Sequence, residues 1–213
     1  MEIGLPLNDY ERELFRLVQL ARTEPTTIAK LLKEERLPNY DGSLLTLVPS
    51  LNPKRRVQLE THEGAAACQE AISFLNSTSG LPALTLSKGL TLAAKKATNK
   101  FGQEGSREID ATAFISEFGR MEPGSTAAEI CALGARDAKG MLFSLLICDG
   151  DDLRTQRNDM FEQEWTHVGL AVGKHNSSLN TIAVVLFARN FQEKATSSGA
   201  QQHGAPLWRV NEP

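Results

Sequence analysis

The stretch that most restricts the fold is residues 147–191, in the last third of a chain of 213 residues. It contains two apolar runs, residues 166–173 and 181–191, separated by the turn-rich tetrad HNSS at residues 175–178. Two such runs around such a tetrad predict an antiparallel β-hairpin. The second run is nearly all apolar, which is typical of a central strand that is covered on both faces. The remaining chain must then supply helices that cover this sheet.

The other segments have mainly helical periodicity. Apolar residues recur at helical spacing in residues 9–21, 25–32, 61–76, 90–101, 112–118 and 138–148. Thr61 and Ser87 are the predicted caps of the third and fourth of these helices. The short apolar segment 126–133 carries one acid, Glu129, and is predicted as a further strand. Residues 37–59, rich in proline, are predicted as a long surface loop.

Composition excludes several classes of protein. The net charge of -3 gives no global basic field that would favour nucleic acid. The three cysteines, Cys68, Cys131 and Cys148, are odd in number and lie in apolar segments, so we expect free thiols. The first residues resemble no signal peptide, and no uncharged run approaches the roughly 20 residues of a membrane span. These features favour a cytoplasmic location.

Three motifs, in order, resemble those of one protein family. The segment from Gln103 to Gly105, with the Phe-Gly pair at 118–119, is similar to a His-x-Gly…Tyr-Gly segment. Residues 129–134, EICALG, are similar to Glu-Asn-Ile-x-x-Gly. Residues 154–157, RTQR, followed by VGLA at 168–171, are similar to Arg-Gly-His-Arg…Val-Gly-Val-Gly. Together these motifs resemble the CAP superfamily of cysteine-rich secretory, antigen-five and pathogenesis-related proteins, here as a divergent intracellular member.

The resemblance implies an α+β fold, a three-layer α-β-α sandwich with a small, mainly antiparallel sheet. The length predicts one domain, over residues 1–191. The polar composition after it predicts a partly disordered tail, 192–213, in which Trp208 is a candidate anchor. The family's cleft holds two histidines with acidic partners. The matching positions here are Gln103 and Gln156, and only the acid, Glu129, is kept. An amide is a poor zinc ligand and no general base, so we expect no metal, no cofactor and no catalytic residue.

Four residues are candidates for lining the cleft: Gln103, Glu129, Gln156 and His167. Glu129 has two interpretations, because an acid in an apolar strand must be compensated. It is either a structural acceptor, with Arg154 or Arg157 as a candidate partner, or a carboxylate facing a ligand. His167, which matches no family histidine, is either packed at a strand end or part of the site.

Two charged groups outside the motifs also have alternative interpretations. The acidic turn at residues 149–152 is spaced for calcium but lacks the pattern of an EF-hand loop, which favours helix capping. The basic triplet Lys54-Arg55-Arg56 is either a solvated surface or a contact for phosphate or a partner.

These observations predict a non-enzymatic, CAP-like binding module whose partner is a lipid or a protein. Two alternatives stay open. One is a structural subunit of a larger cytoplasmic assembly. The other is a hydrolase, which would need a nucleophile and base that the motif positions do not contain.

Overall fold

The centre of the computed structural model, which describes residues 7–47 and 56–194, is a four-stranded sheet. Its strand order is β4 (Thr85–Leu86), β7 (His167–Lys174), β8 (Thr181–Ala188) and β6 (Ala127–Leu133). β4 is parallel to β7, whereas the β7–β8 and β6–β8 pairs are antiparallel. The predicted hairpin is confirmed, and β8 is a central strand.

The uniform apolarity of β8 follows from helices on both faces of the sheet. Successive side chains of a strand point to opposite faces, so a strand buried on both sides needs apolar residues throughout. Seven of its eight residues are buried. Its side chains divide between two cores: one contains Ala183, Val185 and Phe187, and the other contains Ile182, Val184, Leu186 and Ala188.

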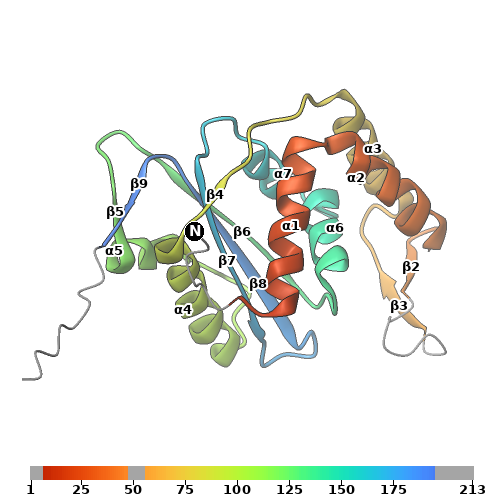
Figure 1. The fold of residues 1–213 in the computed structure, drawn as a ribbon. Helices are drawn as coiled ribbons and strands as arrows, with labels where there is room; N and C mark the ends of the chain where they lie inside the picture. Colours follow the sequence, from red (N-terminus) through yellow and green to blue (C-terminus); the bar gives the residue numbers. More distant parts are fainter. Residues whose placement is uncertain (1–6, 48–55, 195–213) are drawn as a thin grey trace, which may run out of the picture.

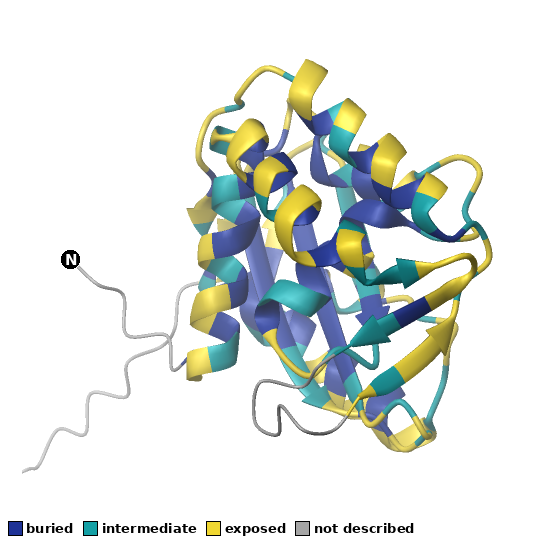
Figure 2. Ribbon diagram, turned by 90° about the vertical axis from the view of Figure 1, so that its right-hand side faces the viewer, coloured by how far each residue is buried: buried dark blue, intermediate teal, exposed yellow. Residues whose placement is uncertain are grey.

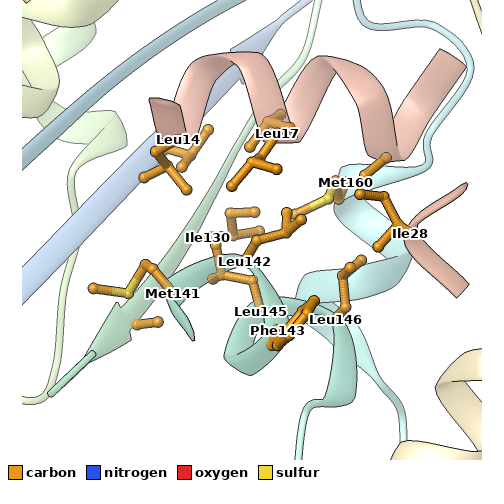
Figure 3. Close-up of a cluster of buried hydrophobic side chains, with 14 of the residues drawn as sticks. Leu14, Leu17, Ile28, Ile130, Met141, Leu142, Phe143, Leu145, Leu146 and Met160 are labelled. Atoms are coloured by element: carbon orange, nitrogen blue, oxygen red, sulfur yellow. The ribbon is translucent and has the colours of Figure 1, made fainter. Parts of the chain in front are cut away.

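The first core is covered by α1 (Asp9–Thr23) and α6 (Ala138–Ile147), as Figure 3 shows for the side chains between these helices and Ile130 of the sheet. α1 begins with a capping box, in which Asn8 and Glu11 each accept the other's backbone N–H. α6 is apolar on nearly every side because seven of its ten residues are buried.

The second core is covered by α4 (Lys88–Glu104), which begins at the predicted cap Ser87. After it come the 3-10 turn η3 (Thr112–Phe114) and the short helix α5 (Ile115–Phe118), which ends at Gly119 as predicted. α4 and α1 therefore lie on opposite faces of the sheet (Figure 1), which confirms the α+β class and its three layers. Figure 2 shows the result, with buried strands enclosed by helices whose outer surfaces are exposed.

The prediction of a surface loop over residues 37–59 is wrong for its described parts, 37–47 and 56–59. The π-helical segment η1 (Leu32–Arg36) continues α2 (Pro25–Leu31), and the 3-10 turn η2 (Leu37–Asn39) follows. A three-stranded antiparallel sheet is then formed by β1 (Tyr40–Asp41), β2 (Leu44–Leu47) and β3 (Val57–Glu60). Leu45 of β2, 5% exposed, faces inward and pairs with Leu59. These strands were not predicted because each run is short and is surrounded by prolines and charged residues, which are typical of loops.

Two predicted boundaries also need correction. The third helix, α3 (Ala65–Ser77), starts after Gly64, and Thr61 does not cap it because its hydroxyl donates to the carbonyl of Ser43. At the other end, an ordered strand continues two residues beyond the predicted domain limit at 191. β9 (Phe191–Glu193) pairs with β5 (Gly119–Met121) in a two-stranded sheet. Residues 195–213 with Trp208, and Lys54 and Arg55 of the basic triplet, lie outside the described residues.

Cys68, Cys131 and Cys148 are all free, as predicted. Burial raises the pKa of the Cys68 and Cys131 thiols to about 11. Both thiols are therefore protonated near neutral pH and unreactive as nucleophiles. Within the described ranges, no helix combines the length and apolar character that crossing a bilayer requires.

Candidate functional site

Glu129 occupies the middle of the edge strand β6, on the face that looks toward α4. Its Oε2 accepts the backbone N–H groups of Ala111 and Thr112, the latter at 3.1 Å. These groups begin the 3-10 turn η3, whose first donors have no partner within the turn. The carboxylate therefore joins the η3–α5 segment to the sheet, in agreement with the interpretation of Glu129 as a structural acceptor.

Gln156 reaches the same strand from α7 (Thr155–Met160). Its Oε1 accepts the backbone N–H of Cys131 at 2.8 Å, two residues beyond Glu129. Because β6 is at the edge of its sheet, this N–H would otherwise lack a partner on that side. Glu129 and Gln156 therefore both lie at β6, and an oxygen of each side chain accepts backbone N–H groups.

The predicted ion pair between Glu129 and Arg154 or Arg157 is wrong, because both arginines bind α3 and the residues just before it. Arg154 Nη2 lies 2.5 Å from Glu63 Oε2, and Arg157 Nη2 lies 2.6 Å from Glu70 Oε1. The hydrogen bond from Arg154 holds the pKa of Glu63 down at about 2. Sequence spacing could not reveal these pairs, since they join residues more than 80 positions apart.

Asp149 and Asp151 both accept backbone N–H groups, but only Asp151 does so at the first residue of a helix, which agrees with the capping interpretation there. Asp149 accepts from the N–H groups of His62 and Glu63 ahead of α3, at 2.8 and 2.9 Å. Asp151 accepts from Leu153 and Thr155 at the start of α7, at 3.0 and 2.7 Å. In the parts of the chain that the structure describes, no three His, Cys, Asp or Glu side chains are grouped to hold a metal ion.

Gln103 lies apart from the other candidates, exposed in the last turn of α4. Its carbonyl accepts from the side chain of Asn176 at 2.9 Å, in the turn between β7 and β8. His167 is at the opposite end of β7, about 23 Å from Lys174 at a strand rise of roughly 3.3 Å per residue. The four candidate residues therefore do not line one cleft.

His167 is half-buried, and its Nδ1 lies 2.8 Å from the hydroxyl of Thr166. Burial lowers the pKa of its imidazole, although the nearby carboxylate of Glu193 acts in the opposite direction. These contacts agree with the interpretation of His167 as a packed residue at a strand end.

A hollow that the sequence did not indicate lies between the end of α3 and the segment after α7. It is an open depression of about 540 Å³, lined by Phe74, Thr78, Asn158, Phe161, Glu162, Gln163 and Glu164. The rings of Phe74 and Phe161 meet edge to face, with 5.2 Å between their centroids. The lining residues come from two distant segments, and no short motif marks them.

Replacing Glu129 by Gln should change how stability depends on pH. Burial is the largest influence on the Glu129 carboxyl and raises its pKa, despite two backbone donors. A raised pKa stabilises the fold below the unfolded-state value, near 4.3, and this contribution is lost as pH rises through the folded-state value. Urea unfolding at pH 4 and pH 7 should therefore show wild type gaining stability relative to Glu129→Gln on acidification.

The exposed Glu108→Gln variant removes the same charge and serves as the control. The raised pKa would be contradicted if the stability of wild type relative to Glu129→Gln were greater at pH 7 than at pH 4.

Comparisons with known proteins yield a likeness in structure alone. No family model matches the chain, and no curated protein matches it. A solved structure, that of an outer surface protein from Borrelia burgdorferi, aligns with 55% of this chain and 83% of its own, at 18% identity and a TM-score of 0.42.

The predicted cytoplasmic location is withdrawn, because the matching structure is named as an outer surface protein.

Proposed function

We propose that the protein is a non-enzymatic interaction module with a CAP-like scaffold, and that it binds a protein partner. The observation that carries the proposal is that Glu129 and Gln156 bind backbone N–H groups with their acceptor oxygens. Both donors reach Oε2 of Glu129, so these bonds attach the carboxylate to the η3–α5 segment. The acid that the motif retains therefore has a role in the scaffold, which disfavours the hydrolase alternative.

Close packing favours a protein partner over a lipid held between the layers. A Cβ atom on Gly169 of β7 would overlap the backbone of Leu90 and Thr91 in α4. On the other face, Leu14, Leu142 and Phe187 are completely buried. An acyl chain would need a gap between helices and sheet, and these contacts leave none at the centre of either layer.

Assays of wild type and Glu129→Gln on esterase and peptidase substrates test the non-enzymatic part. Both proteins should give no turnover above the buffer blank. Turnover by wild type that disappears in Glu129→Gln would show a working acid–base group and overturn the proposal.

Native mass spectrometry of the protein purified from its own cells tests the class of partner. We expect a bound protein chain and no retained lipid. An acyl lipid that is held at one copy per chain would contradict the preference for a protein partner.

A further inference from the structure

The C-terminal strand β9 inserts an aromatic ring into a slot with glycine walls. Phe191, 4% exposed, lies between Gly89 of α4 and Gly119 of β5. A Cβ on Gly89 would be 2.8 Å from the ring, and a Cβ on Gly119 would overlap it. Since a side chain at either position would fill the space, the slot exists because both residues are glycine.

Glu193 adds a charged contact on the same side of β9, because residues two apart in a strand point the same way. Its Oε1 accepts the hydroxyl of Ser87 at 2.9 Å and the backbone N–H of Lys88 at 2.7 Å. These donors begin a helix of 17 residues, whose dipole favours a carboxylate there. The slot and the helix start together select phenylalanine followed, two residues later, by glutamate.

Backbone pairing holds β9 in an extended conformation beside β5 (Figure 1). Met121 is paired with Phe191, and Gly119 with Glu193. The backbone N–H of Lys194 donates to the carbonyl of Phe118 at 3.0 Å. Paired backbone with pockets for alternate side chains is the arrangement by which proteins recognise an added peptide strand.

The connection that returns β9 to the slot depends on one backbone conformation. Only Arg189 and Asn190 separate β8 from β9, and Asn190 has a φ of 49°. Asparagine and glycine tolerate this left-handed region, whereas β-branched residues are strongly disfavoured there. A substitution of Asn190 can therefore displace β9 without altering any residue that lines the slot.

We propose that the slot between α4 and β5 is a peptide-binding site for extended Phe-x-Glu segments, which β9 occupies within its own chain. A Phe-x-Glu segment of a partner protein would fill it when β9 leaves. This inference deepens the proposed function, on which it rests, by naming the chemistry of the partner. Since only chains with an open slot can bind, the apparent affinity equals the intrinsic affinity multiplied by the fraction of chains whose slot is open.

The test uses a fluorescein-labelled peptide, Arg-Asn-Phe-Gln-Glu-Lys, and full-length protein, with binding measured by fluorescence anisotropy. Asn190→Val should favour release of β9, and Asn190→Gly should keep it bound. Affinity should fall in the order Asn190→Val, wild type, Asn190→Gly, with about tenfold or more between the two variants. Peptides with Ala for Phe, or Gln for Glu, should bind more weakly to Asn190→Val.

Equal affinity for the three proteins, or no loss with the Ala peptide, would overturn the proposal. If Asn190→Val does not fold, Glu193→Gln replaces it, because it weakens β9 and leaves the slot intact. That variant should bind the peptide more tightly than wild type, and equal binding would also overturn the site. A negative result in the peptide-binding experiment would not change the result of the turnover assays. The peptide-binding site and the non-enzymatic function can therefore be contradicted separately.

Discussion

Val184→Asp is expected to prevent soluble folding. Val184 lies in the centre of β8, is 0% exposed, and is paired with Cys131 on one side and Ala171 on the other. A carboxylate there would face the apolar core beneath α4 without a cation to compensate it. An uncompensated buried charge costs about 3–5 kcal/mol, and the lost apolar burial of the valine adds roughly 1.5–3 kcal/mol, which together reach or exceed the lower part of the typical total stability of roughly 5–15 kcal/mol. Soluble yield and thermal unfolding of the purified variant measure the effect.

Thr181→Asp is the matched control, since it places the same acid on the same strand. Thr181 is only half-buried and is paired with the exposed Lys174 at the end of the hairpin. This variant should stay soluble and melt within a few degrees of wild type. Soluble Val184→Asp with unchanged melting would show that the strand is not buried as described.

Gly169→Ala is expected to have the second largest effect, although it adds only one methyl group. The new Cβ would overlap the backbone of Leu90 and Thr91, and a helix backbone cannot move aside as the end of a side chain can. Overpacking usually costs about 1–3 kcal/mol, and we expect about 3 kcal/mol or more against a backbone. In a protein of this size that lowers the melting temperature by roughly 10 °C.

Gly173→Ala provides the comparison on the same strand and the same face of the sheet. Its Cβ would lie 3.2 Å from Cβ of Thr98, so a displacement of about a few tenths of an ångström relieves the contact. Calorimetry should place this variant within about 1 kcal/mol of wild type, because alanine also restricts the unfolded chain. Similar destabilisation at positions 169 and 173 would contradict the close approach of α4 to β7 at Gly169.

The candidate site illustrates which interactions a linear pattern can indicate. Glu129 is identifiable in the sequence because a lone acid within an apolar strand must be compensated. Its partners are not, because backbone N–H groups are present at nearly every residue and carry no sequence signal. Gln103 and Gln156 match positions of one family motif set, yet Gln156 binds β6 and Gln103 binds the β7–β8 turn.

Periodicity was enough to predict the hairpin and the helices that cover its two faces, because burial on two faces leaves a continuous apolar run such as β8. The strands between residues 40 and 60 escaped prediction because each is short and depends on a distant partner. The pairing of Arg154 and Arg157 with Glu63 and Glu70, and the glycine slot around Phe191, arose only from the packing of remote segments. Local pattern reflects which side of an element is buried, whereas the identity of a contact depends on how the elements are placed in three dimensions.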